Sequence, residues 1–118
     1  MDYGDNNAHH LMPQALFEAL PDLYSQEDVA DPIVHAKFFT PDAGATWLIM
    51  EVDKNTRGDE YMFCFAYLGP HMADCAELGY VTMAELRRIR GALRLPVERD
   101  LNWTPMPLSQ AKKREWGL

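Results

Sequence analysis

Residues 77–100, ELGYVTMAELRRIRGALRLPVERD, decide the fold because several independent local signals agree there. Thr82 and Glu85 have capping-box spacing, in which the hydroxyl accepts from the first helical turn and the carboxylate accepts from the backbone at the cap. A helix is therefore expected to begin at about Met83. Gly91 is expected to end it in the left-handed conformation, and a proline soon afterwards excludes further helix. The stretch predicts a strand, a short helix and a second strand.

One face of this helix is apolar. At 100° per residue Met83, Leu86 and Ile89 fall on a single stripe, which predicts packing on a sheet. Arg90 projects at the edge of that stripe, so we expect its guanidinium to form a structural ion pair that fixes the helix. The carboxylates nearest in sequence are Glu77, Glu98 and Asp100.

The centre of the chain predicts the sheet. Residues 33–39, 46–52 and 61–68 are rich in β-branched and aromatic side chains and are separated by turn-forming segments, which predicts an antiparallel meander. Residues 80–81 and 96–101 would add a fourth and a fifth strand. With a first helix starting near Pro13, the sequence predicts an α+β domain with two short helices on one face of the sheet.

Length and pattern divide the chain into three parts. At 118 residues it is expected to form one core without metal or disulfide support. We expect a mobile segment over residues 1–12, a single α+β domain over 13–103, and a C-terminal tail over 104–118 that packs on the domain or on a partner. No cofactor is expected, and no metal site, because adjacent His9 and His10 diverge in a regular element.

The net charge of −7 is unevenly distributed. Residues 1–80 hold 14 acids and 3 bases, whereas residues 81–118 hold 4 acids and 8 bases. An acidic molecule repels phosphate, so direct nucleic-acid binding is not expected. The longest apolar run, residues 62–68, is too short to span a bilayer, and a cytoplasmic location is expected.

Acidic residues are the candidates for partner binding. They concentrate before the first strand and recur in the turns between strands, where a basic surface on another protein could meet them. The candidate residues are Glu18, Asp22, Glu27, Asp28, Asp31, Asp42 and Asp53.

An alternative site would lie on the sheet. Alternation along the strands places His35 and Lys37 on one face of the first strand, and Trp47 and Glu51 on one face of the next. If both rows faced the same side, they would line a ligand pocket. A shift of one residue in the hairpin register would separate them.

Several motifs resemble a known family. They are LPDLYSQE (20–27), VHAKFFTPD (34–42), Thr46-Trp47, ELGYVTMAEL (77–86) and LPVERD (95–100). In this order, over residues 16–103, the chain resembles bacterial domain-of-unknown-function family 2958, whose members are carried on plasmids and other mobile elements. The resemblance implies cargo of mobile DNA. It supplies no catalytic residues, because the family has none assigned.

Three functions stay open. The first is a non-enzymatic acidic protein that occupies a basic surface of a host nucleic-acid defence complex, as anti-CRISPR and antirestriction proteins do. The second is a small-ligand binding domain or an undetected enzyme that uses the Lys37, Glu51 and His35 face. The third is an accessory subunit of a conjugation or replication assembly, docked through Trp103, Met106, Leu108 and Trp116. The sequence has no Gly-rich phosphate loop, GxSxG elbow or HExxH motif.

Overall fold

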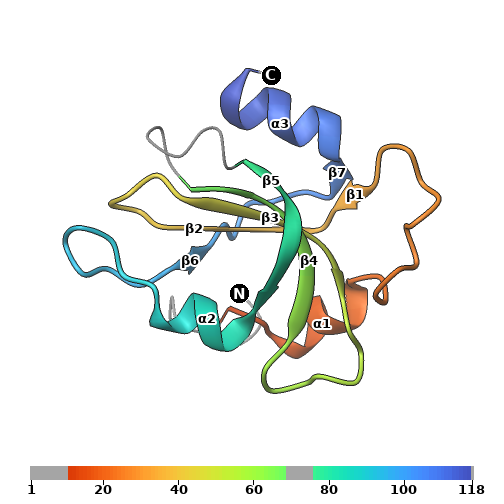
Figure 1. The fold of residues 1–118 in the computed structure, drawn as a ribbon, viewed down its shortest axis with the longest axis horizontal. Coiled ribbons are helices and arrows are strands. Elements are labelled where there is room, and N and C mark those ends of the chain that lie inside the picture. Colours follow the sequence, from red (N-terminus) through yellow and green to blue (C-terminus); the bar gives the residue numbers. More distant parts are fainter. Residues whose placement is uncertain (1–10, 69–75, 118) are drawn as a thin grey trace.

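The computed structural model describes residues 11–68 and 76–117 and contains a curved sheet between two layers of helix (Figure 1). A mobile segment was expected over residues 1–12. Residues 1–10 of it lie outside the described residues, whereas Leu11 and Met12 are buried in the core. The elements in chain order are α1 (Gln14–Ala19), β1 (Ile33–Val34), β2 (Ala36–Phe39), β3 (Thr46–Val52), β4 (Tyr61–Tyr67), β5 (Glu77–Thr82), α2 (Met83–Arg88), β6 (Glu98–Arg99), β7 (Met106–Pro107) and α3 (Leu108–Trp116).

The main sheet has five antiparallel strands in the order β5-β4-β3-β2-β6. Strands β2, β3, β4 and β5 are neighbours in chain order and form the predicted meander. Strand β6 joins the sheet at its other edge, beside β2. A second, two-stranded sheet pairs β1 with β7. The predicted α+β class with a five-stranded antiparallel sheet is confirmed.

Both faces of the sheet are covered. Helices α1 and α2 pack on one face, where Phe38, Met83 and Leu86 are fully buried. Helix α3 packs on the other face, over Val34 and Leu48. The two helices predicted for one face are present there, and the C-terminal tail supplies a third helix on the opposite face (Figure 1).

Helix α2 begins where its capping box predicts but ends sooner. Thr82 accepts from the backbone N–H of Glu85, and the Glu85 carboxylate accepts in return from the N–H of Thr82. The helix ends at Arg88, followed by an extended Ile89. The prediction for Gly91 is wrong, because its φ is not positive. An added Cβ there would lie 1.6 Å from the carboxylate of Asp42, so a larger residue would require the Asp42 side chain to move.

The register of β3 determines which side chains share a face. Lys37 is opposite Leu48 and Phe38 is opposite Trp47, so Lys37 and Trp47 point to opposite faces. The register then shifts between Ile49 and Glu51, which is the signature of a β-bulge. The bulge places Glu51 opposite Phe63, on the α3 side of the sheet.

Candidate functional site

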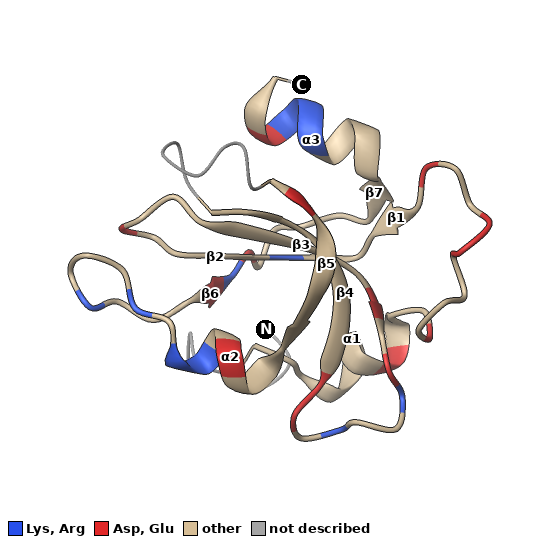
Figure 2. Ribbon diagram, viewed as in Figure 1, with Lys and Arg blue, Asp and Glu red and all other residues tan. Residues whose placement is uncertain are grey.

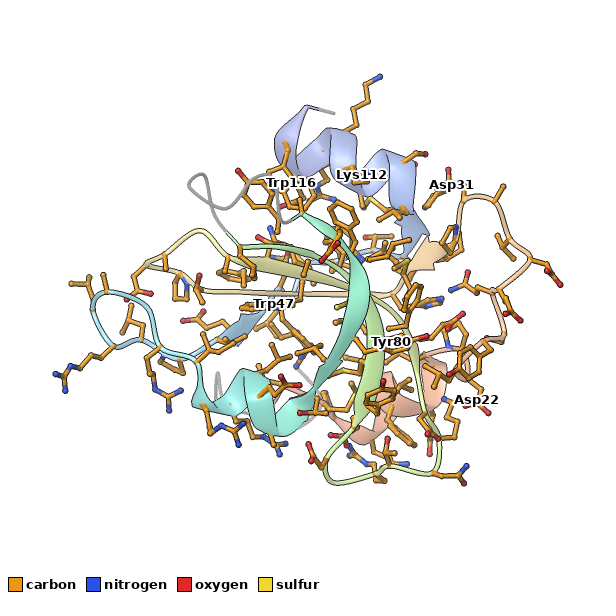
Figure 3. All side chains as sticks on the ribbon, viewed as in Figure 1. Asp22, Asp31, Trp47, Tyr80, Lys112 and Trp116 are labelled. Carbon is orange, nitrogen blue, oxygen red and sulfur yellow. The ribbon has the colours of Figure 1, made fainter. Side chains whose placement is uncertain are left out.

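A pocket of about 340 Å³ opens between the loop that joins α1 to β1 and the α3 side of β4 and β5. In Figure 3 Tyr80 lies on the side of β5 that faces the loop carrying Asp22 and Asp31. The lining is mainly apolar and aromatic. It comprises Tyr24, Gln26, Glu27, Val29, Ala30, Pro32, Glu51, Phe63, Leu78, Tyr80 and Leu108.

Glu51 holds the loop over this pocket. Its side chain is only 4% exposed, and its two carboxylate oxygens accept from the backbone N–H groups of Tyr24 and Gln26, each at 2.8 Å. Gln26 adds a second tie, because its side-chain amide accepts from Ile33 N and donates to Met50 O. A loop without regular structure is thereby fixed to the sheet by a buried charge with good hydrogen bonds.

Tyr24 at the rim of the pocket has a strained backbone. Its φ is 69°, in the left-handed region of backbone conformation that residues other than glycine seldom adopt. The ring is 59% exposed although the backbone is held by Glu51. Such strain persists only where the surroundings impose it, and it concentrates at functional sites. The loop therefore presents an aromatic side chain to solvent from a constrained position.

Aromatic rings form the opposite wall. Tyr80 stacks on Tyr61 with centroids 5.1 Å apart and lies 5.2 Å from the ring of Phe63. Partial burial, followed by the hydrogen bond with Tyr24, raises the pKa of the Tyr80 hydroxyl. Tyr80 therefore contacts Tyr61 and Phe63 of β4 as well as Tyr24 of the loop.

The acidic residues predicted for partner binding do not form one surface. Figure 2 shows acidic segments in the loop before β1 and in the β2–β3 turn, acids and bases together in the β3–β4 turn, and further bases on α2, in the loop after it and on α3. Glu27 and Asp28 are exposed in the loop beside the pocket. Of the residues that line the pocket, the only charged ones are Glu27 and Glu51.

Several of the acids predicted for partner binding accept hydrogen bonds within the molecule. Asp22 accepts from the backbone of Lys54, and Asp53 accepts from that of Asn55. Asp42 accepts from the N–H of Leu93 at the far end of the sheet. Glu18 on α1 accepts from Gln14, and Asp31 accepts from both the N–H and the hydroxyl of Ser109 at the start of α3.

The four residues of the alternative ligand face do not meet in one pocket, although Lys37 and Glu51 both lie on the α3 side of the sheet. Lys37 forms an ion pair with Glu115 of α3 at 2.5 Å, and Glu51 binds the loop backbone. Trp47 is 4% exposed in the core under α1 and α2. His35 is half-buried, and burial, followed by the charge of Lys54, lowers the pKa of its imidazole. Of the four residues, Glu51 alone reaches the pocket.

Arg90 has different partners from those predicted. Its guanidinium donates to the carbonyls of Arg87 and Ile89, at 2.7 and 2.8 Å. Within the described part of the chain it forms no ion pair with Glu98 or Asp100. The side chain closes the C-terminal end of α2 by satisfying carbonyls that the helix leaves unpaired.

The C-terminal tail packs on its own domain. Met106 and Leu108 are buried in the core under α3, and Trp103 and Trp116 pack against that core. The Trp103 indole donates to Val34 O at 3.0 Å, and Lys112 lies over the ring of Phe65. The apolar tail residues considered as docking contacts are therefore occupied within the molecule.

Within residues 11–68 and 76–117 no group of three metal-binding side chains is present, and no helix is long and apolar enough to cross a membrane. His9 and His10 lie outside the described residues.

Sequence reasoning missed Tyr24, Leu78 and Tyr80 as site residues. Leu78 and Tyr80 alternate along β5 and are 51% and 45% exposed, so an apolar alternation in a short strand was the available signal. Tyr24 carries no such signal, because its position depends on contacts with Glu51, 27 residues away.

Comparison with known protein families identifies a family that covers most of the chain. The model of the family described as "Protein of unknown function (DUF2958)" matches residues 11–113. No curated protein and no solved structure matches the chain.

Proposed function

The chain belongs to the DUF2958 family, and we propose that it is a non-enzymatic interaction protein that binds a basic segment of a partner protein. The observation that carries the proposal is the fixed loop over the pocket, where Glu51 anchors Tyr24 and Gln26 and leaves Glu27 at the rim. An apolar pocket beside a fixed loop that exposes the carboxylates of Glu27 and Asp28 suits a partner segment with an apolar anchor next to lysines or arginines.

The chemistry of the pocket favours binding over catalysis. Both oxygens of Glu51 already accept hydrogen bonds from the loop backbone, so this carboxylate is poorly placed to act as a general base. None of the residues lining the pocket is a histidine, lysine or cysteine. The lining also contains no serine or threonine, so it lacks the usual nucleophile–base pairs of covalent catalysis.

A host nucleic-acid defence complex is the partner class that we propose. Such complexes hold phosphate with lysine and arginine, and carboxylates on a rigid rim can compete for those bases. The resemblance to proteins of mobile elements supports an inhibitor of the anti-CRISPR or antirestriction type, acting in the cytoplasm. Electrostatic capture of this kind is fast and weakens as salt rises.

The test compares two charge reversals that leave the same net charge. Glu27→Lys alters the rim of the pocket, whereas Glu98→Lys alters β6 at the opposite edge of the sheet. Each tagged variant and the parent are used for pull-downs from cells expressing CRISPR and restriction complexes, at low and high salt. Captured proteins are quantified by mass spectrometry.

We expect the parent and Glu98→Lys to recover the same nucleic-acid-handling complex at low salt, with much less at high salt. Glu27→Lys should lose about tenfold or more of that recovery, because a repulsive charge replaces an attractive one. Equal loss with both variants would indicate a general charge effect. Recovery that is independent of salt and of Glu27 would contradict the proposal.

A small aromatic ligand is the second candidate occupant, favoured by the size of the pocket and by the Tyr61–Tyr80 stack. Small-molecule sites typically occupy roughly 300–1,000 Å³, and this pocket lies at the lower end of that range. A compound that raises the melting temperature of the parent but not of Tyr80→Ala would favour this function over partner capture.

A further inference from the structure

Strand β5 is a free edge of the main sheet. It pairs with β4 on one side, and in the described residues no strand pairs with its other side. Tyr61 O accepts from Asp53 N, which directs the backbone of Tyr61 toward β3. Successive residues of an antiparallel strand direct their backbone N–H and C=O groups to opposite sides. Cys64 and every second residue on either side of it in β4 therefore form the backbone hydrogen bonds with β5, where Cys64 is opposite Gly79. The N–H and C=O groups of Leu78 and Tyr80 therefore point away from the sheet.

Each face of this edge has its own pocket. The first is the 340 Å³ pocket under the acidic loop. The second, of about 350 Å³, lies on the α2 side and is lined by residues that include Trp47, Cys64 and Ile89. Leu78 and Tyr80 border both pockets. Successive side chains of an extended chain alternate between the two faces of a sheet, so a strand added here would offer side chains to both pockets in turn.

Gly79 lies between these two residues. A Cβ built there would meet no atom within 4 Å, so neither packing nor close approach inside the molecule requires a glycine. Glycine weakens a strand interior, and in strands it often marks a place where another backbone approaches closely. At Gly79 the open space belongs to the second pocket.

The charges around both pockets have one sign. The charged residues of the first lining are Glu27 and Glu51, and those of the second are Glu77 and Glu85. Neither lining contains a lysine, an arginine or a histidine. An occupying strand is therefore favoured when basic residues flank its apolar side chains, and a second copy of the same edge would bring like charges together.

We propose that β5 receives an extended segment of a partner protein as a sixth strand, with adjacent apolar side chains in the two pockets and flanking bases beside the exposed carboxylates of Glu27 and Glu77. This assignment rests on the proposed function and specifies its mode of recognition. Backbone hydrogen bonds to Leu78 and Tyr80 supply part of the affinity, and the two pockets supply selectivity.

The experiment begins with a phage-displayed library of random 12-residue peptides, selected on the full chain. We expect enrichment of adjacent apolar or aromatic residues flanked by lysine or arginine. An enriched peptide is then synthesised with a fluorophore, and its Kd is measured by fluorescence polarisation. Selection on Gly79→Phe, whose ring would fill the second pocket, should not enrich the same peptides.

Two variants at Leu78 separate backbone from side chain. Leu78→Ala removes the half-exposed side chain, and Leu78→Pro also removes the outward N–H, which an edge strand tolerates. We expect Leu78→Pro to bind the peptide about tenfold more weakly than Leu78→Ala, from one lost hydrogen bond and the bulk of the ring. The melting temperatures of both variants show whether each one folds. If Leu78→Pro does not fold, protection of the Leu78 and Tyr80 amides from hydrogen exchange on peptide binding replaces it.

Each other outcome overturns the assignment in a distinct way. Binding that Glu27→Lys weakens but Leu78→Pro and Gly79→Phe leave intact would refute the added strand and keep the proposed function. If none of these three variants changed the affinity for the peptide, both the added strand and the proposed function would be refuted. A dimer of the parent that Leu78→Pro dissociates would show that β5 pairs with a second copy. If the selection enriched no peptide, the proposal that an extended segment binds at β5 would be refuted.

Discussion

At the scale of single residues, Glu51 links the fold to the candidate site. A carboxylate that is 4% exposed is unfavourable unless it is hydrogen-bonded, and the N–H groups of Tyr24 and Gln26 meet that need. The bulge in β3 is the cause of its position, because alternation without a bulge would direct Glu51 to the face that carries Trp47. One glutamate therefore determines where the acidic loop and its strained tyrosine lie.

Glu51→Gln is expected to destabilise the protein and to loosen the loop. An amide presents only one oxygen, so its NH₂ group would face a backbone N–H and leave a buried donor without a partner. We expect the free energy of unfolding to fall by about 1–3 kcal/mol. Urea denaturation measures this loss. Glu27→Gln, exposed in the same loop, is the control and should change stability by less than about 0.5 kcal/mol. Equal stability of Glu51→Gln and the parent would contradict the anchoring role.

At the scale of elements, the same loop also holds α3. Pro107 offers no side-chain cap, and Asp31 substitutes for one by accepting from the N–H and the hydroxyl of Ser109. The Ser109 hydroxyl, followed by its backbone N–H, lowers the pKa of the Asp31 carboxyl below 3.8. One loop therefore connects the pocket, β3 and the helix that covers the second core.

This bond is expected to make α3 sensitive to acid. Because the folded pKa of Asp31 is depressed, its contribution to stability is present above pH 3.8 and is lost as the pH falls through the folded value. Asp31→Asn should be less stable than the parent at neutral pH, and the difference should shrink below pH 3.8. Denaturation across pH, together with hydrogen exchange of the Ser109 amide, measures both effects. A difference that grows in acid would contradict this role.

The elements themselves were largely predictable, and their contacts were not. The capping box of Thr82 and Glu85 predicts the start of α2, and runs of β-branched and aromatic residues predict β3 and β4, because these signals are local. Helix α3 was missed because its apolar periodicity is weak and its cap comes from Asp31, in a distant segment. The proximity of Asp42 to Gly91, across 49 positions of sequence, could not be predicted from local patterns.

At the scale of the whole molecule, the asymmetry of charge along the sequence does not become one acidic face. The loop before β1 and the basic loop after α2 lie at opposite ends of the sheet in Figure 2, and other acids are used in turns. The candidate site could be predicted only in part, since Glu27 and Glu51 were identified but Tyr24, Leu78 and Tyr80 were not. A one-residue bulge between Ile49 and Glu51 reassigns faces, and no local pattern in the sequence encodes it.

Site-specific photo-crosslinking tests the location of partner binding most directly. A benzoylphenylalanine replaces Tyr24 at the rim of the pocket or, as a control, Leu93 in the loop after α2, which is 75% exposed at the opposite end of the sheet (Figure 1). After irradiation of cells that carry the defence complexes, we expect the Tyr24 position to crosslink a nucleic-acid-handling protein through a basic segment and Leu93 to give none. Crosslinking from Leu93 with none from Tyr24 would contradict the account.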